Sequence, residues 1–451
     1  MPRKSLFSAD PHSWSVLLCS FRRSLSLKSL ALPFPNHRRL PCVTIFHSML
    51  SFEQARQLII TETKSHQAAS PTSLRPLADA LGYVLAQEIR ADRDYPPFHR
   101  STRDGYAVRA REAVENSTLR CFGEIKAGDT VLTPLEPGTC VQIMTGAAVP
   151  PGADAVVMIE FTRRSGDAVT FDRDTQATQN IVAQGCEART GDLALAPGLR
   201  LGFAELAIAA QVGAASLLCY EKPRVAILST GDEIVPIPET PGPFHIRNSN
   251  GVSLAAQVRL AAGHPVPLGH ALDRVEDLSA KIELGLQHDI LVLSGGVSMG
   301  KYDLVESVLK SFGAEFFFDA VAIRPGKPTV FGRCRDKLVF GLPGNPVSTM
   351  VTFQLFVTAA IDLLSGAAPR PLPLLNATLS ESLHEKPGLA HFLPARLEWS
   401  SASAKVHALP WQGSGDIAAL RHANCFLVVP ADRHDIPAGE NVSVLPRLDV
   451  L

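Results

Sequence analysis

The sequence predicts a multidomain protein of the α/β plus β class. We expect a doubly wound parallel-sheet domain, an inserted all-β domain, a helical and extended linker region and a small C-terminal β-barrel. The 451 residues are enough for about three or four domains. Strands and helices alternate between residues 223 and 368, whereas the flanking stretches contain short β-like runs between turn residues. The expected boundaries are 49–90 with 180–222 for the linker, 91–179 for the inserted β domain, 223–368 for the α/β domain and 369–451 for the barrel.

Two helices are expected before the inserted β domain. The first covers residues 52–67, with Ser51 as its N-cap, and the second covers residues 77–88, where apolar residues recur at helical spacing. Short runs such as TCVQIMTG and ADAVVMIEF then indicate the strands of the β domain. An Ala-rich helix at residues 203–212 completes the linker.

Three apolar strands mark the α/β domain: RVAILST, DILVLSGG and KLVFGL. We expect a helix after each of them, near residues 249–262, 303–312 and 347–364. Strands that are apolar throughout and lead into helices through Gly, Ser or Thr turns are typical of a parallel sheet that is covered on both faces. Ligands of such sheets bind at the carboxyl ends of the strands.

Composition and missing motifs exclude several functions. Hydrophobic residues make up 46% of the chain, and the net charge of −1 gives no support for a nucleic-acid or membrane-surface partner. The 8 cysteines contain no C-x-x-C pair, which favours reduced thiols in the cytoplasm. No apolar run reaches the roughly 18 residues of a membrane span. The chain also lacks H-E-x-x-H, G-x-S-x-G and Walker motifs.

Residues 1–48 differ from the rest because they are rich in Arg and Ser and contain a single acid, Asp10. This composition is typical of an organelle transit peptide. We favour a disordered extension or a misassigned start, with Met49 as the first residue, because MLSFEQARQLII resembles the start of a first helix.

Three polar turns follow the three strands of the α/β domain: STGDEIV (229–235), SGGVSMGKYD (294–303) and GLPGNPVS (341–348). Glycines permit close backbone approach and free N–H groups at helix starts attract anions, so we expect the turns to bind an oxyanion. Asp232, Glu233 and Asp303 belong to the same turns. Carboxylates beside an anion are reasonable where Mg²⁺ bridges the two. Ordinary α/β loops are the alternative interpretation.

Two further segments carry candidate site residues. IRPGKPTVFG (323–332) places Arg324 and Lys327 around a Pro-Gly turn, where they either bind oxyanions or belong to a solvated surface turn. In the β domain, Asp104 of YPPFHRSTRDGYAV and Thr145 of IMTGAAVPPGADAVV are either turn residues or substrate contacts.

These motifs, in this order and followed by WQGSGDIAALRHANCFLVVP, resemble the MoeA family of molybdopterin molybdenumtransferases, which also includes the E domain of gephyrin. The resemblance runs from about Met49 to the C-terminus. It implies a MoaB/MogA-like α/β domain and the last step of molybdenum cofactor biosynthesis. In this step the family inserts molybdate into adenylated molybdopterin and releases AMP, and Mg²⁺ is required. The resemblance also implies a cytoplasmic homodimer with an inter-subunit active site, and other molybdenum-cofactor synthesis proteins as candidate partners.

The resemblance assigns roles to individual residues. The implied catalytic residues are Asp104, Thr145, Glu233 and Asp303. The implied metal ligands are Glu233, Asp273 and Asp303. The implied cofactor-binding residues are Ser229, Gly231, Ser294, Gly295, Gly296, Ser298, Arg324, Lys327, Pro343, Gly344, Asn345, Ser348 and Ser414.

The chain departs from the family pattern in several places, and two other functions stay open. In the segment 323–332, which we call the cationic turn, Arg324 stands where the family commonly has a lysine. The other departures are Ala320, Glu187, Leu389 and Pro394, of which the last two stand at arginine positions of the family's barrel. Arg396 or His391 are candidate substitutes for those arginines. The changes concern the molybdate pocket more than the overall reaction. The alternatives are a non-catalytic scaffold of the gephyrin type and an enzyme of the adenylation step, which the two β modules disfavour.

Overall fold

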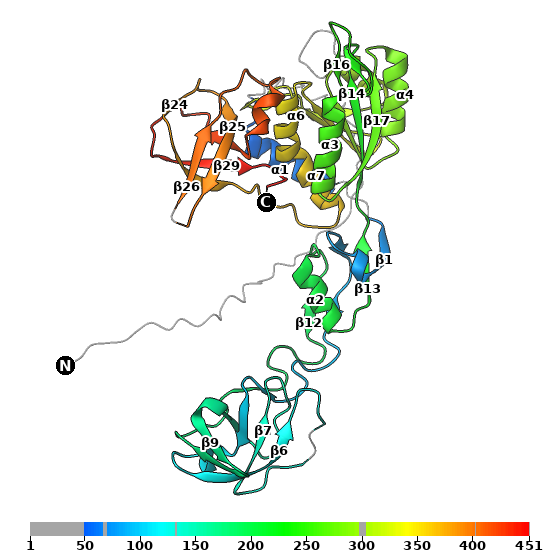
Figure 1. Cartoon of the computed structure of the whole chain (residues 1–451). Helices are drawn as coiled ribbons and strands as arrows, with labels where there is room; N and C mark the ends of the chain where they lie inside the picture. The colour runs from blue at the N-terminus through cyan, green and yellow to red at the C-terminus, as the bar shows by residue number, and fades with distance from the viewer. Residues whose placement is uncertain (1–48, 66–69, 131–132, 297–303, 402, 451) are drawn as a thin grey trace, which may run out of the picture. The chain divides into compact units, whose positions relative to one another are not determined.

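The computed structural model describes residues 49–65, 70–130, 133–296, 304–401 and 403–450. The predictions made for residues 1–48, for Ser298 and for Asp303 lie outside the described residues. The described chain forms an α/β domain, a β-barrel, an all-β domain and a linker of short strands with one helix (Figure 1). The predicted multidomain α/β plus β class is therefore confirmed.

The α/β domain is built on a six-stranded sheet with the order β17-β14-β18-β22-β21-β19. The pairings among β17, β14, β18 and β22 are parallel, whereas β21 is antiparallel to both of its neighbours. The bounds are β14 Arg224–Thr230, β17 His264–Ala271, β18 Ile290–Ser294, β19 Glu315–Phe318, β21 Val330–Cys334 and β22 Lys337–Leu342. The sequence analysis predicts β14, β18 and β22 but not β17, which contains Pro265 and Pro267. Proline is tolerated there because β17 is an edge strand.

Side chains of β14 alternate between two cores on the two faces of the sheet. Val225 and Ile227 pack in a cluster with residues of α1, α3, α6 and α7, whereas Ala226 and Leu228 pack with residues of α4 and α5. Figure 1 shows α3 and α4 on opposite sides of β14 and β17. The predicted doubly wound arrangement is therefore confirmed. The helices are α1 Phe52–Ser65, α3 Ser249–Leu260, α4 Val275–Gly285, α5 Leu304–Ser311, α6 Pro346–Thr352 and α7 Thr358–Leu364.

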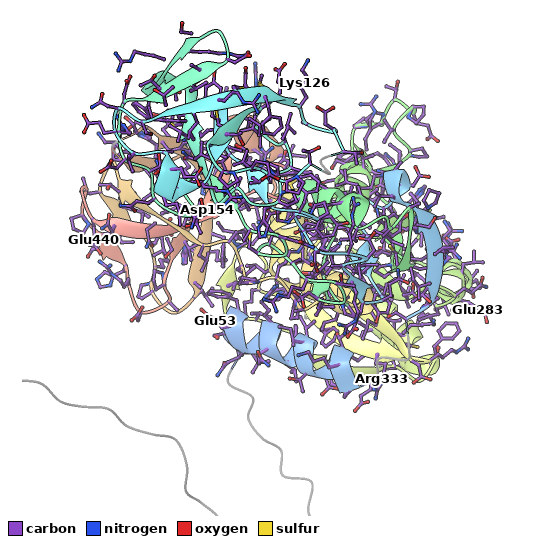
Figure 2. The ribbon with its side chains drawn as sticks, turned by 90° about the horizontal axis from the view of Figure 1, so that it is seen from below. Glu53, Lys126, Asp154, Glu283, Arg333 and Glu440 are labelled. Carbon is purple, nitrogen blue, oxygen red and sulfur yellow. The ribbon has the colours of Figure 1, made fainter. Side chains whose placement is uncertain are left out.

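The first helix begins at its predicted cap. The Gln54 N–H donates to Ser51 Oγ at 3.3 Å and the Ser51 N–H donates to Gln54 Oε1 at 2.9 Å, which is a reciprocal capping box. Glu53 lies at the start of α1 (Figure 2), where the helix dipole favours a carboxylate. The buried face of α1 packs into the α/β core.

One apolar helical stretch ends the α/β domain and consists of α6, the π-helical segment η4 Phe353–Val357, and α7. Pro346–Leu364 is long and apolar enough to cross a membrane, with a mean hydropathy of 1.6, but 89% of it is buried inside the protein. It is therefore a core helix. Gln354 Nε2 in η4 donates to the carbonyl of Pro446 at 2.6 Å and so ties this helix to the last barrel strand.

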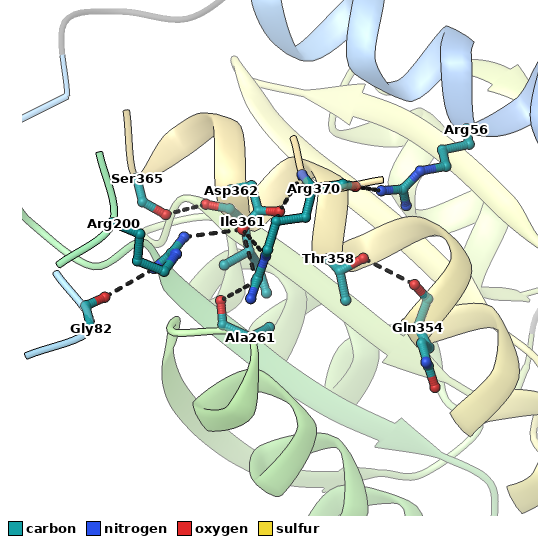
Figure 3. A network of polar contacts seen from close by, with 10 residues as sticks. All are labelled: Arg56, Gly82, Arg200, Ala261, Gln354, Thr358, Ile361, Asp362, Ser365 and Arg370. Carbon is teal, nitrogen blue, oxygen red and sulfur yellow. Dashed lines mark hydrogen bonds and ion pairs between the residues drawn. The ribbon is translucent and has the colours of Figure 1, made fainter. Parts of the chain in front are cut away.

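A buried carboxylate on α7 connects the α/β domain to the linker (Figure 3). Asp362 is 1% exposed and accepts hydrogen bonds from Arg200 Nη2 and Arg370 Nε, both at 3.0 Å. Arg200 also donates to the carbonyl of Gly82 at 2.9 Å. Burial lowers the pKa of the Arg200 guanidinium, and Arg370 lowers it further, so the Asp362 charge is needed to hold both arginines.

The C-terminal domain is a closed barrel with the strand order β25-β26-β23-β29-β27, because β27 pairs back to β25. The short strand β20, Ile323–Arg324, adds to this sheet by pairing with Ala390–His391 of β25. The bounds are β23 Leu375–Leu379, β25 Ala390–Trp399, β26 Ala404–Ala408, β27 Cys425–Val429 and β29 Asn441–Pro446.

The inserted domain is a six-stranded sheet with the order β8-β5-β7-β6-β10-β9. Its two faces bury separate apolar clusters, one centred on Tyr106 and Phe171 and the other on Leu135 and Ile143. The predicted all-β domain is confirmed. The bounds are β5 Gly105–Val108, β6 Thr118–Ile125, β7 Thr139–Ile143, β8 Ala155–Met158, β9 Thr162–Ser165 and β10 Ala168–Phe171.

The linker contains strands where the sequence predicts a helix. The prediction of a helix over residues 77–88 is wrong, because this stretch forms η1 Leu77–Asp79, a turn and β2 Val84–Leu85. Gly82 adopts φ +77°, which interrupts a helix, and β2 pairs with β13, Ser216–Tyr220. β13 also pairs with β1, Thr72–Pro76. The predicted helix at residues 203–212 is confirmed as α2, Phe203–Gln211.

Candidate functional site

A cleft of about 580 Å³ lies where β14, β18 and β22 end. Its size falls within the range of about 300–1,000 Å³ that is common for small-molecule sites. All three predicted turns line the cleft, and a barrel segment at Gly415 and Ile417 also contributes. The predicted site residues among the lining residues are Ser229, Gly231, Glu233, Asp273, Ser294, Gly295, Gly296, Pro343, Gly344 and Asn345.

Glycines allow the three turns to touch. A Cβ atom on Gly344 would lie 3.4 Å from the Cα of Gly295, and a Cβ atom on Gly295 would lie 2.6 Å from the carbonyl oxygen of Thr230. Gly295 also adopts φ +94°, a conformation that L side chains rarely adopt. The backbone of the second turn therefore lies against that of the first turn at a distance that only glycine at position 295 permits, and it lies in ordinary contact range of the third turn.

Carboxylates gather at the first turn. Glu233 and Asp273 both line the cleft, and the Asp273 N–H donates to Asp232 Oδ1 at 3.0 Å. Partial burial and the charges of Asp232 and Glu233 raise the pKa of the Asp273 carboxyl. The cluster therefore favours a positive charge, which a bound cation would supply. Among the described residues no set of three metal-ligating side chains is already assembled, and Asp303 lies outside them.

The helix start that follows the third turn offers fewer free donors than predicted. Pro346 has no N–H, and the Val347 N–H donates to the carbonyl of Ser414 at 3.1 Å. Asn345 Nδ2 donates to Ser414 Oγ at 2.7 Å, so the predicted residues Asn345 and Ser414 are in contact. Ser348 is buried in α6 and does not line the cleft.

The two cations of the predicted cationic turn do not line the cleft. Arg324 is exposed in β20, and Lys327 is exposed next to Pro328, which is a lining residue. The lining residue Arg247 is a cation that the sequence analysis does not predict. Arg247 Nε donates to the carbonyls of Ile237 and Glu239 at 2.9 and 3.0 Å.

Asp104 and Thr145 of the β domain lie together. The Thr145 N–H and hydroxyl both donate to Asp104 Oδ1, at 2.6 and 2.9 Å. These two bonds lower the pKa of the exposed Asp104 carboxyl, so it is ionised. The pair arises because Gly105 and Ile143 are register partners on β5 and β7. Neither residue lines the cleft.

The sequence analysis also missed two polar cleft residues at the start of α3, Asn248 and Asn250. Asn248 is the N-cap of this helix, and its Oδ1 accepts from the Gly251 N–H at 2.9 Å. The available signal was Asn248 directly before the helix predicted near residues 249–262, since Asn is a preferred N-cap residue.

Comparisons with known proteins match most of the chain from residue 50 onward. Family models match residues 50–213 (MoeA N-terminal region, domain I and II), 226–363 (probable molybdopterin binding domain) and 376–447 (MoeA C-terminal region, domain IV). A molybdopterin molybdenumtransferase of Staphylococcus epidermidis is 32% identical over 378 residues, which cover 82% of this chain and 90% of that protein. The enzyme of the same name from Staphylococcus aureus is 32% identical over 402 residues, which cover 87% and 94%.

Solved structures agree with these matches. The crystal structure of a molybdopterin biosynthesis MoeA protein from Pyrococcus horikosii has a TM-score of 0.70 at 30% identity and covers 88% of this chain and 99% of that one. A second MoeA structure, from Pyrococcus horikoshii OT3, has a TM-score of 0.75 at 26% identity and covers 88% and 100%.

Proposed function

Because the chain belongs to the MoeA family, we propose that it is a molybdopterin molybdenumtransferase that inserts molybdate into adenylated molybdopterin. The reaction cleaves the phosphoanhydride, releases AMP and completes molybdenum cofactor biosynthesis. The single observation that carries the proposal is the cleft where three glycine turns and the carboxylates of Glu233 and Asp273 meet. Phosphoryl chemistry depends mainly on positioning and charge neutralisation, so no activated nucleophile is required.

Glu233 of the first turn and Asp273, which follows β17, fit a Mg²⁺ ion. Glu233 and Asp273 would supply oxygen ligands, and partial burial together with the nearby charges of Asp232 and Glu233 raises the pKa of the Asp273 carboxyl. Mg²⁺ is commonly held by one or two carboxylates together with phosphate oxygens and water. When bound there, the ion would neutralise charge on the phosphoanhydride.

The chain's own groups position the substrate. The Ser294 hydroxyl lies at the end of β18, lines the cleft and accepts a hydrogen bond from Asn250 Nδ2, so its own proton can be donated to a phosphate or molybdate oxygen. The Ser229 hydroxyl also lines the cleft, but its proton is donated to Asn248 Oδ1. The close packing of Gly295 and Gly344 lets backbone approach the ligand without intervening side chains. Arg324 and Lys327 do not line the cleft, so their exposed positive charges would attract the anionic substrate from outside it rather than contact its oxygens.

An assay of AMP release tests the activity. The protein should release AMP from adenylated molybdopterin only when molybdate and Mg²⁺ are both present. Glu233→Gln should lower kcat by about 100-fold or more, because it removes a charged group that acts on the phosphoanhydride. Glu239→Gln is the matched control, since Glu239 is exposed on the same loop and does not line the cleft. Tight binding of the substrate by the wild type without AMP release would refute the enzyme and favour a scaffold.

The active protein is a homodimer with a site between subunits. Phe203 at the start of α2 is 88% exposed, and a helix as apolar as α2 is normally covered. The exposed, ionised Asp104 would reach the cleft of the partner subunit. Free cysteines among the described residues fit a cytoplasmic location, where other proteins of molybdenum cofactor synthesis are candidate partners.

Mixing two inactive variants tests the shared site. If Asp104 acts across the interface, a mixture of Asp104→Asn and Glu233→Gln proteins forms heterodimers that contain one intact site. The activity should recover to roughly a quarter of the wild-type value, because half of the dimers are mixed and each has one intact site of two. A mixture as inactive as its components, in which exchanged dimers are detected by mass, would exclude the inter-subunit site.

A further inference from the structure

We propose that Asn250 is a positioning residue that holds the second and third turns of the cleft in register. Asn250 is in the first turn of α3. Its Nδ2 donates to Ser294 Oγ at 2.8 Å and to the carbonyl of Gly344 at 2.7 Å. One amide group therefore links the end of β18 to the turn that follows β22.

The orientation of this amide is fixed by its partners. A backbone carbonyl oxygen can only accept hydrogen bonds, so the atom that faces Gly344 must be the amide nitrogen. The Oδ1 atom of Asn250 consequently lies buried without a partner among the described residues. A buried unpaired acceptor is unfavourable and is tolerated mainly where a site requires the group beside it.

Asn248 makes the corresponding link to the first turn. Its Oδ1 accepts from Ser229 Oγ at 2.8 Å as well as from the Gly251 N–H. The start of α3 thus contacts the ends of all three strands whose turns line the cleft. Sheet pairing alone aligns these strands only as far as Ser229, Ser294 and Leu342. Beyond that point, Gly344 relies on contacts such as the Asn250 bond.

The expected consequence is weaker substrate binding with little change in chemistry, and this part rests on the proposed function. The turns contact the substrate before and during the reaction, so a looser pair of turns should raise KM and leave kcat nearly unchanged. A purely structural defect would lower the amount of active protein, and hence the apparent kcat, at constant KM.

Amide hydrogen exchange in the ligand-free protein tests the positioning role. In Asn250→Ala, peptides that cover residues 294–296 and 343–345 should exchange about ten-fold faster than in the wild type, since two hydrogen bonds are lost. Ser294→Ala removes one of these bonds from the other side and should accelerate the second turn but not the third. The difference in exchange between the two turns of Ser294→Ala can be measured even if Asn250→Ala fails to fold.

Asn424→Ala is the matched control. The side-chain amide of Asn424 likewise makes two hydrogen bonds, since it donates to the Leu397 carbonyl at 2.8 Å and accepts from the Leu397 N–H at 2.7 Å, but it lies in the barrel. It should accelerate exchange in the barrel and leave both turns unchanged. Unchanged exchange at both turns in Asn250→Ala, or acceleration spread evenly over the whole sheet, would overturn the proposal.

The kinetic measurement separates this proposal from the proposed function. In the AMP-release assay, Asn250→Ala should raise KM about ten-fold and keep kcat within about three-fold of the wild type. A wild-type protein that releases no AMP would refute the proposed function, while the exchange experiment would still decide the role of Asn250. An active wild type and an Asn250→Ala variant with unchanged KM would overturn the positioning role.

Discussion

Replacing Gly295 with alanine should distort the cleft more than it destabilises the fold elsewhere. The new Cβ atom would lie 2.6 Å from the carbonyl oxygen of Thr230, which is backbone and has no other rotamer to adopt. The residue would also keep φ near +94°, at a cost of about 1–2 kcal/mol for an L side chain. Overpacking adds about 1–3 kcal/mol. The free energy of unfolding should therefore fall by about 2–5 kcal/mol, and the second turn should move away from β14.

Gly388→Ala separates these two contributions. Gly388 has a similar φ of +102°, but a Cβ atom there would have no neighbour within 4 Å. Its cost should be about 1–2 kcal/mol, with unchanged AMP release. Urea denaturation measures the stability of both variants, and single-turnover AMP release measures their activity. The activity of Gly295→Ala should drop about 100-fold, because a shift of the second turn by about 1 Å disrupts the positioning of the substrate. The reasoning is refuted if the two variants match in stability and in activity.

Three further substitutions test other parts of the structure. Asp362→Ala should lower the free energy of unfolding by about 3 kcal/mol in urea denaturation, because Arg200 and Arg370 lose their buried carboxylate partner. The control is Glu398→Gln, which removes the exposed ion pair with Arg396 and should cost less than about 1 kcal/mol. Burial and then Arg224 lower the pKa of His288 below its ordinary 6.5, so the unfolded chain binds the proton more readily and the stability of the protein should fall as the pH drops below about 6.5. The melting temperature of His288→Gln should therefore depend less on pH than that of the wild type. An identical pH dependence would contradict this assignment. Asn248→Ala should lose about 1 kcal/mol of α3 capping in thermal unfolding, while Asn248→Asp keeps the acceptor and should stay near the wild type; equal losses would argue against the cap.

The long apolar elements of the α/β domain could be predicted because their signal is local. RVAILST, DILVLSGG and KLVFGL each contain an uninterrupted apolar run, as strands buried on both faces do, and they form β14, β18 and β22. β17 could not be predicted from the same signal, because an edge strand tolerates the two prolines that argue against a strand. The stretch 77–88 has helical spacing, but pairing of β2 with the distant strand β13 decides its structure.

In the candidate site, too, local sequence signals predict some features, whereas others depend on the tertiary structure. The glycine and acid turns could be located because each follows a predicted strand, and parallel strands bring such turns to one edge. Proximity of Asp104 to Thr145 depends on a register between β5 and β7 that no local pattern specifies. The positions of Arg324 and Lys327 outside the cleft likewise depend on the pairing of β20 with the barrel strand β25.

The sequence alone determined the three central strands of the α/β sheet, the residue types of the turns that follow them and the family to which the chain belongs, because these follow from patterns within short segments. Tertiary structure decided which side chains meet across long separations, such as Asn250 with Gly344 and Arg200 with Asp362. The physical reason is that such contacts depend on strand register and on how helices pack, and both are set by the whole core.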